Sequence, residues 1–353
     1  EAADMPPVHR LTFAPLLHAP PRPTGVHRQW RPLQICGRGW TTSDGTPAEL
    51  GAAIGNALAN GLIPMVELHD ATGDWSRLGQ CVDWWVRSDV VSVLQEHEDY
   101  LLVNIANECG NQVGESDFIA GYTDAITRMR AAGILTPLVI DASGWGQNID
   151  ILQATFDDLL AVDPEQNLLF SVHMWWAGRP GSEITAEIDE SVALEVPLIV
   201  GEFAHKGTTG SACSSDIDYH TIIAECEAND IGWLAWSWGC ADAGYCNGDC
   251  GEMDMTSNAT YAGLERWGLE VAVTDPNSIQ NTSVRPYYLE HGSCQSGGGA
   301  GGASGAGGTS GAPATGGQPA TGGASGAGGT SGAPATGGQP ATGGQPATGG
   351  QPA

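Results

Sequence analysis

The chain has 353 residues, with 41 acidic and 13 basic side chains and a formal net charge of −28. This acidic balance argues against nucleic-acid binding, which needs Lys and Arg side chains to replace the counterions of the phosphates. No run of 18 apolar residues occurs, so the sequence predicts no membrane span.

The first 36 residues form an atypical segment rich in Pro and Arg. Residues 1–40 carry five of the 13 basic residues and seven of the 21 prolines. Proline at this density does not make central strands. The stretches RLTF (10–13) and LQIC (33–36) are weak strand candidates. We therefore expect the sheet to be irregular or incomplete over its first two strands.

Six short apolar runs follow, and each has the length and composition of a buried strand. They lie at 62–70, 100–108, 135–143, 168–176, 196–203 and 232–239. Nearly continuous apolar strands are typical of a parallel sheet covered on both faces. With amphipathic segments between them, they predict a (β/α)8 barrel. A doubly wound open sheet is the alternative, and it is disfavoured because no GxGxxG sequence follows any of the runs.

Two of the intervening segments predict helices. Apolar side chains recur at steps of three and four residues within 78–94 and again within 116–133. For the second helix, Ser116 is the expected N-cap and Gly133 the expected C′ residue.

Polar and aromatic side chains end each apolar run, Asp70 and Asp141 among them, and two glutamates stand out, Glu108 and Glu202. In a parallel barrel all strand ends of this kind meet at the face where active sites form. A single Glu in such a place is more simply a salt-bridged rim residue. Two of them, with His and Trp at the neighbouring strand ends, fit glycoside hydrolysis, in which one carboxyl group protonates the leaving oxygen and the other attacks or stabilises the anomeric carbon.

Nine cysteines are unusual for a cytosolic enzyme and favour an oxidising compartment. Because nine is odd, at least one thiol lacks a partner within the chain. Cys240, Cys246 and Cys250 lie close together in the sequence. A disulfide-stapled loop is the favoured interpretation, and a zinc site is the weaker one, because the spacing matches no familiar ligand pattern.

From about Gln295 onward the chain contains only Gly, Ala, Ser, Thr, Pro and Gln. A segment with no charge and almost nothing to bury cannot offset the entropy of ordering it. Residues 295–353 are therefore predicted to be a flexible linker or tail, and residues 37–294 a single catalytic domain.

Six motifs together resemble the bacterial β-mannanase branch of glycoside hydrolase family 5. They are HDATG (69–73), NIANE (104–108), DASGWGQ (141–147), SVHMW (171–175), IVGEFAH (199–205) and GWLAWSW (232–238). The resemblance covers about residues 39–290. It implies a retaining hydrolase on a (β/α)8 barrel, working without a cofactor or a metal.

The resemblance also implies individual roles. Glu108 would be the acid/base and Glu202 the nucleophile, so the first needs a raised pKa and the second must stay ionised. Six further residues would contact the sugar: His69, Asn107, Trp145, His173, Trp175 and Trp236.

Within that set, Asn107 would contact the sugar 2-hydroxyl, and Trp236 would form the floor of the −1 subsite.

Two departures from the family are visible. Trp175 stands where the family has a tyrosine near the nucleophile, so its N–H is the group left to serve that carboxylate. In the family, the second strand carries an arginine that contacts the nucleophile. The opening strands here do not match the family, and Arg31 and Arg38 are the candidates to replace that arginine.

The resulting hypothesis is a secreted, extracellular, monomeric endo-β-1,4-mannanase acting on β-mannan-type polysaccharides. Another β-1,4-glycanase, such as an endoglucanase, is the first alternative, because a catalytic pair alone does not select manno- from gluco-configured sugars. The second alternative is a weakly active or inactive barrel that binds polysaccharide through its tryptophans, and the atypical first 36 residues motivate it.

Overall fold

The computed structural model describes residues 9–12, 34–43, 45–209, 212–239 and 253–283. The chain divides into two compact units, residues 1–297 and 298–353, and all described residues belong to the first. The predicted cysteine loop at 240–250 and the predicted tail at 295–353 lie outside the described residues. Every helix within the described ranges is too short or too polar to cross a membrane.

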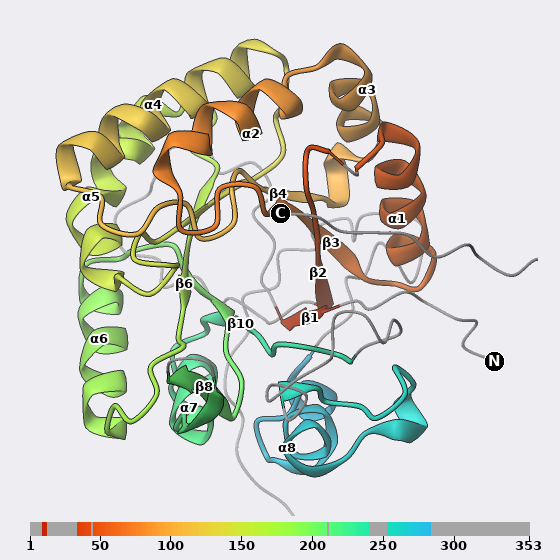
Figure 1. Ribbon diagram of the computed structural model, residues 1–353, viewed down its shortest axis with the longest axis vertical. Helices are drawn as coiled ribbons and strands as arrows, with labels where there is room; N and C mark the ends of the chain where they lie inside the picture. Colours follow the sequence, from red (N-terminus) through yellow and green to blue (C-terminus); the bar gives the residue numbers. More distant parts are fainter. Residues whose placement is uncertain (1–8, 13–33, 44, 210–211, 240–252, 284–353) are drawn as a thin grey trace, which may run out of the picture. The chain divides into compact units, whose positions relative to one another are not determined.

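The described strands close into a barrel in the order β1-β10-β7-β6-β5-β4-β3-β2 (Figure 1). Their bounds are β1 (His9–Thr12), β2 (Gln34–Trp40), β3 (Ile63–Leu68), β4 (Leu102–Asn104), β5 (Leu138–Asp141), β6 (Leu168–His173), β7 (Leu198–Glu202) and β10 (Gly232–Leu234). From β2 to β7 each strand pairs in parallel with the next, and β10 is parallel to β7. Each of the six predicted runs contains one of these strands, and the barrel prediction is confirmed.

The irregularity expected over the opening strands is found in β1. Strand β2 pairs in parallel with β3 from Ile35 to Trp40, so LQIC does begin a regular barrel strand. Strand β1 has four residues and runs antiparallel to both of its neighbours, β2 and β10. The described ring therefore closes through one short reversed strand, where an all-parallel barrel has a parallel one.

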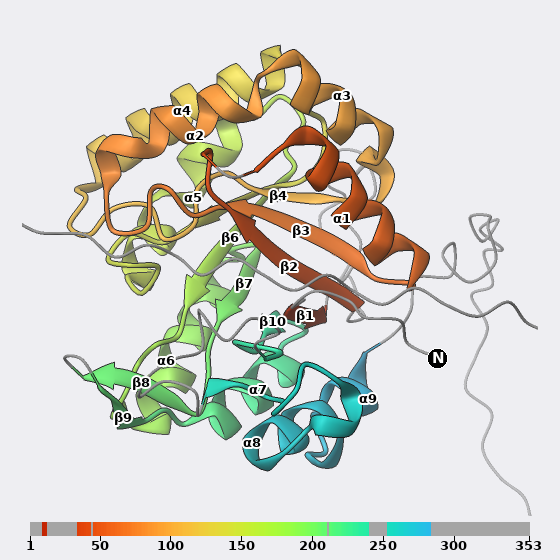
Figure 2. The same ribbon diagram turned by 45° about the vertical axis from the view of Figure 1, so that its right-hand side comes forward.

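Helices surround the strand ring (Figures 1 and 2). They are α1 (Pro47–Ala59), α2 (Leu78–Trp85), α3 (Ser88–Glu96), α4 (Glu115–Ala131), α5 (Ile149–Val162), α6 (Gly181–Ala193), α7 (Tyr219–Ala228), α8 (Arg266–Leu269) and α9 (Ile279–Thr282). Shorter helical turns lie at Trp75–Arg77, Glu98–Tyr100, Tyr261–Gly263 and Glu270–Thr274. A two-stranded antiparallel sheet, β8 (Lys206–Thr209) and β9 (Ala212–Asp216), follows β7.

Two details of the helix predictions need correction. The segment 78–94 forms two helices, α2 and α3, separated by an extended residue, Arg87. Helix α4 begins one residue after Gly114, so Ser116 lies in its first turn and does not cap it. Gly133 follows the helix with a φ of +86°, as predicted for a C′ residue.

Side chains alternate along each strand, so every second residue faces the barrel interior. The interior residues are apolar at one end of the barrel and polar at the other. The apolar end is a separate cluster of Ile63, Met65, Leu102, Val139, Leu169, Ile199 and Leu234. Two residues further along the same faces stand the buried polar residues Glu67, Asn104, Asp141 and Ser171. The sequence thus builds an apolar layer at one end of the barrel and a polar layer at the C-terminal ends of the strands, where active sites of such barrels form.

A buried ion pair ties α4 to the segment that follows α5. Arg130 donates to the Asp163 carboxylate through Nε at 2.8 Å and Nη2 at 2.9 Å, and to the carbonyl oxygens of Ile134 and Thr136. Removing the guanidinium leaves a buried carboxylate without a counter-charge, which costs about 3–5 kcal/mol. We expect Arg130→Met to lower the free energy of unfolding by about that amount in a urea titration.

Arg128 provides the matched control, because it lies on the same helix and pairs with Asp83 and Asp124 at the surface. Exposed pairs contribute about 1 kcal/mol or less. Arg128→Met should therefore leave the urea midpoint almost unchanged. Equal losses from the two substitutions would contradict the structural role of Arg130.

Candidate active site

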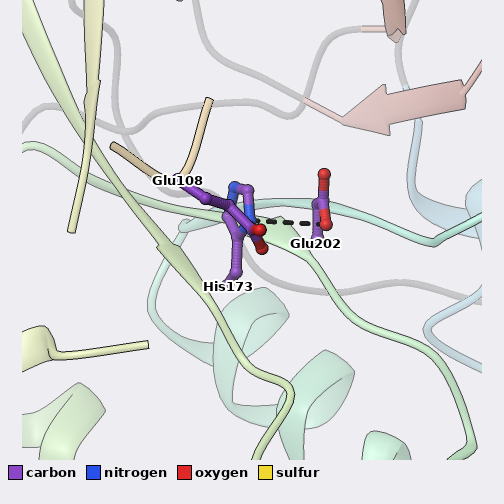
Figure 3. Close-up of side chains that lie close together, drawn as sticks. All are labelled: Glu108, His173 and Glu202. Carbon is purple, nitrogen blue, oxygen red and sulfur yellow. Dashed lines mark hydrogen bonds and ion pairs between the residues drawn. The ribbon is translucent and has the colours of Figure 1, made fainter. Parts of the chain in front are cut away.

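Three side chains from different strand ends meet at the polar end of the barrel (Figure 3). Glu108 follows β4, His173 ends β6 and Glu202 ends β7. His173 Nδ1 lies 2.9 Å from Glu108 Oε1 and 3.3 Å from Glu202 Oε2. The ring nitrogen and one oxygen of each carboxylate all lie within 4.8 Å of one another. The structure thus brings together the two carboxylates that the sequence singled out, with an imidazole between them.

The backbone of Glu108 is held in an unusual conformation. Its φ is +48°, in the left-handed region that a residue with a Cβ occupies at a cost of about 1 kcal/mol or more. Its N–H donates to Asp141 Oδ2 at 2.8 Å, and its carbonyl oxygen accepts from the Gly73 N–H at 2.9 Å. Asp141 is itself fixed, because Asn104 Nδ2 donates to its Oδ1 at 2.9 Å. These bonds aim the Glu108 side chain at the cavity.

His173 is surrounded by carboxylates. In addition to the two glutamates at Nδ1, Asp141 Oδ2 lies 3.5 Å from Nε2. Burial lowers the pKa of His173, but the charges on Glu202 and Asp141 and its hydrogen bonds outweigh burial and raise it well above its usual range. Burial likewise raises the pKa of Asp141, while the charge of His173 and the bond from Asn104 hold it below its ordinary value. His173 is therefore positioned as a cation between anions.

Glu202 receives two donors on one oxygen. Trp175 Nε1 donates to Oε2 at 3.1 Å, and His173 Nδ1 lies 3.3 Å from the same atom. Burial raises the pKa of Glu202 to about 7, although His173 acts in the opposite direction. His173 is the group that favours the ionised form expected of this carboxylate. The indole N–H of Trp175, the substitute expected for the missing tyrosine, does reach the carboxylate.

A bulge between β6 and β7 sets the direction of Glu202. The register runs from Val172 opposite Val200 directly to His173 opposite Glu202, so Gly201 has no partner of its own. A Cβ at Gly201 would lie 2.1 Å from Ser171 Oγ and 2.8 Å from His173 Nε2. Only glycine fits there without displacing the imidazole. The extra residue leaves both Gly201 and Glu202 on the interior face, with Glu202 opposite His173.

Two other predicted residues, His69 and Trp236, border this centre. His69 Nε2 lies 3.0 Å from Glu67 Oε2. Burial lowers the pKa of His69, but Glu67, with smaller contributions from the charges of Glu202 and Glu108, raises it overall. The rings of Trp236 and Trp175 pack edge to face, with centroids 6.4 Å apart. The peptide bond between Trp236 and Ser237 is cis.

Asn107 precedes Glu108 and is almost fully buried. Its Nδ2 donates to Thr72 Oγ1 at 3.2 Å, which fixes the amide. Its Oδ1 has no hydrogen-bond partner among the described residues. A buried acceptor without a donor is costly, so this oxygen is available to a hydroxyl group of a ligand.

Trp145 lies at the margin of the site and not at its centre. Its side chain is 45% exposed, and its φ of +59° falls between two glycines that also have positive φ, Gly144 and Gly146. The ring packs directly over Gly73, where a Cβ would lie 2.4 Å from the indole. A cavity of about 490 Å³ opens beside Gly144 and is lined mainly by polar side chains, including Asn111 and Ser143.

Sequence reasoning omitted Glu67, Asp141 and Gly201 from the site. Asp141 was visible as a polar strand end, and Glu67 lies two residues before His69 on the same strand face. A glycine inside a strand pattern is a known sign of a bulge or of close packing. Of the arginine candidates, Arg31 and the side chain of Arg38 lie outside what the structure describes.

Comparisons with known proteins agree with one another. A family model described as "Cellulase (glycosyl hydrolase family 5)" matches residues 37–242. A mannan endo-1,4-beta-mannosidase of Salipaludibacillus agaradhaerens is 35% identical over 230 residues, which are 64% of this chain and 70% of that protein. Another, of Cellvibrio japonicus, is 31% identical over 272 residues, 75% of this chain and 59% of that protein. Among solved structures, a mannohexaose complex of the Thermomonospora fusca β-mannanase is 32% identical, with a TM-score of 0.63 over 72% of this chain and 83% of that one.

Proposed function

This chain belongs to glycosyl hydrolase family 5, and from that premise we propose that it is an endo-β-1,4-mannanase that hydrolyses internal linkages of mannan, glucomannan or galactomannan. Two mannan endo-1,4-beta-mannosidases at 35% and 31% identity support this substrate class. So does the similarity to a β-mannanase solved with mannohexaose.

The spacing of the two carboxylates is the observation that carries the mechanism. One oxygen of Glu108 and one of Glu202 lie within 4.8 Å of each other. Retaining glycosidases have carboxyl groups about 5–5.5 Å apart, whereas inverting enzymes need about 6.5–9.5 Å to admit a water molecule. The spacing supports a double displacement that retains the anomeric configuration.

In this mechanism Glu108 gives a proton to the glycosidic oxygen as Glu202 attacks the anomeric carbon. The C–O bond to the leaving sugar breaks, and a covalent glycosyl-enzyme forms. Glu202 then carries no charge, so Glu108, now ionised, takes a proton from the water that cleaves the ester. Trp175 Nε1 and His173 Nδ1 both lie against Oε2 of Glu202. The other oxygen, Oε1, is therefore the proposed attacking atom.

We propose that the residues around the two glutamates bind the sugar chain. Asn107 Oδ1, buried and without a partner among the described residues, is the proposed acceptor for the sugar 2-hydroxyl. Trp236, beside Trp175, is the proposed floor of the subsite at the cleaved bond. His69 is the proposed polar contact on the opposite side, and Trp145, which is exposed, is a platform further along the polysaccharide.

The test has two parts. Release of reducing sugar is compared on mannan, glucomannan, xylan and carboxymethylcellulose, and the first-formed anomer is followed by proton NMR. We expect mannan or glucomannan to be the best substrate and the β-anomer to appear first. Faster hydrolysis of carboxymethylcellulose would contradict the substrate class, and an initial α-anomer would contradict the mechanism.

We also propose that the enzyme acts outside the cell as a monomer. A polymeric substrate and a strongly acidic composition support this location. Among the cysteines whose side chains the structure describes, Cys81, Cys109 and Cys226 are buried free thiols. Any disulfides would therefore involve the other cysteines, which a thiol titration of the denatured protein, before and after reduction, would reveal.

The hydrogen bond from Trp175 leads to a pH prediction. A bond to a charged group contributes about 1.5–3 kcal/mol, which corresponds to one to two pKa units. Trp175→Phe removes a donor that favours ionised Glu202, so its pKa should rise further above about 7. We expect the acid limb of kcat/KM to move upward by about one pH unit, and the rate at neutral pH to fall by about fivefold, because the ionised fraction of Glu202 drops from about one half to about one tenth.

The adjacent Trp176 is the control, because its Nε1 donates to the backbone carbonyl of Gln147 and not to a carboxylate. Trp176→Phe should leave the midpoint of the acid limb in place. If the acid limb of kcat/KM stays fixed in Trp175→Phe, or moves equally in both variants, Trp175 does not favour the ionised form of Glu202.

A further inference from the structure

We propose that Glu108, His173 and Glu202 form a binding site for a tetrahedral divalent transition-metal ion, best represented by Zn²⁺, and that the bound ion inhibits the enzyme. The binding itself is argued from the geometry of the three side chains. Only the inhibition rests on the proposed function.

The three ligand atoms are already spaced for such an ion. In a tetrahedral site with bonds of about 2.0–2.1 Å, neighbouring ligand atoms lie about 3.3 Å apart. His173 Nδ1 lies 2.9 Å from Glu108 Oε1 and 3.3 Å from Glu202 Oε2, and all three atoms lie within 4.8 Å of one another. The His173–Glu202 pair already has this spacing, and the His173–Glu108 pair would need to separate only slightly to reach it (Figure 3).

The ligand set also suits zinc. Imidazole nitrogen and carboxylate oxygen are both common zinc ligands, and three protein ligands leave a fourth position open to water. Mg²⁺ and Ca²⁺ prefer shells made only of oxygen ligands, so an imidazole nitrogen at the centre of the group disfavours them relative to Zn²⁺. The site therefore discriminates between cations by the number and type of its ligands.

Asp141 supplies the outer support that metal-binding histidines usually have. Its Oδ2 lies 3.5 Å from His173 Nε2, on the side of the ring opposite the glutamates. The N–H of Glu108 and Nδ2 of Asn104 hold this carboxylate from behind, at 2.8 Å and 2.9 Å. A carboxylate at one ring nitrogen keeps the proton there, and an ion at the other nitrogen would displace the proton that Nδ1 shares with the glutamates and bind its lone pair.

The negative charge around the proposed site also favours binding of a divalent cation. Four carboxylates, those of Glu67, Glu108, Asp141 and Glu202, stand around two imidazoles at this end of the barrel. A dication between Glu108 and Glu202 would neutralise both. It would also occupy the groups that must protonate and attack the substrate, so its inhibition should be competitive with mannan.

The experiment uses the full chain after treatment with a chelator, titrated calorimetrically with Zn²⁺ and, separately, with Mg²⁺. We expect one Zn²⁺ site, no comparable Mg²⁺ site, and weaker Zn²⁺ binding in the presence of mannotriose. Glu108→Gln and Glu202→Gln keep the side-chain shapes but remove the ligand charges, and each should weaken the site by about tenfold or more. Their melting temperatures show whether both variants are folded.

His220 provides a matched control. It lies 3.5 Å from Glu270 and 3.3 Å from Asp275, but this group is far more exposed. His220→Gln should leave the strong Zn²⁺ site unchanged. Zn²⁺ affinity that persists in both glutamine variants, or that falls in His220→Gln, would overturn the proposal.

The outcomes also separate this proposal from the proposed function. Hydrolysis of mannan without Zn²⁺ binding or inhibition would reject the metal site alone. Zn²⁺ binding of the expected pattern in a protein that does not hydrolyse mannan would keep the site and reject the activity.

Discussion

Replacing Glu202 by alanine is expected to reduce turnover of mannan on the order of 10⁴-fold or more, because no group remains to form the covalent intermediate. The side chain is buried beside His173 and Trp175, so its removal leaves a small space on the attacking face. Azide or formate should enter that space and partly restore the rate on an aryl glycoside with a good leaving group. The product should have the inverted anomeric configuration.

The stereochemistry of the azide product makes this test specific. In Glu202→Ala the anion attacks from the face that Glu202 occupied, and a single displacement inverts the anomeric carbon. A rescued product of retained configuration would show that another residue still forms the intermediate. Unchanged turnover of mannan would remove Glu202 from the mechanism altogether.

Glu108→Ala is expected to have an effect that depends on the leaving group. On mannan the first step needs a proton on the glycosidic oxygen, and its loss costs about 10²–10⁴-fold. An aryl glycoside with an acidic phenol needs no such proton, so its first step should be nearly normal and the glycosyl-enzyme should accumulate. A burst of phenol in stopped-flow measurements would report this.

Azide distinguishes the two variants further. In Glu108→Ala it should speed release of the glycosyl-enzyme, because azide needs no general base, and the product should be of retained configuration. Equal losses on mannan and on the aryl glycoside would exclude Glu108 as the acid. The two glutamate variants should therefore give opposite anomers with the same reagent.

Most of the barrel could be predicted because buried parallel strands are nearly uninterrupted apolar runs. Strand β3, for example, is buried along its whole length. The polar residues that end these strands were visible for the same reason, since they interrupt the pattern. Glu108 and Glu202 could therefore be placed at one face of the barrel before their distance was known.

Other features depend on contacts that a linear pattern does not contain. The left-handed conformation of Glu108 is maintained by Asp141 and Gly73, which are distant in sequence. The reversed direction of β1 is a property of its pairing with β2 and β10. The break between α2 and α3 had a local signal in Ser88-Asp89, a typical helix start, but the continuous apolar periodicity on both sides concealed it.

The bulge at Gly201 places two consecutive residues of β7 on the interior face of the barrel. Side chains of a strand normally alternate between its two faces, but a Cβ at Gly201 would meet Ser171 and His173, and Glu202 also contacts His173. The glutamate therefore depends on having no side chain directly before it, because the same space cannot hold both. Relatives that keep the glutamate but carry a larger residue before it would be expected to fold as barrels and to hydrolyse mannan poorly. When genes of this kind are sorted into enzymes and non-enzymes, the residue before the second glutamate should count as much as the two glutamates themselves.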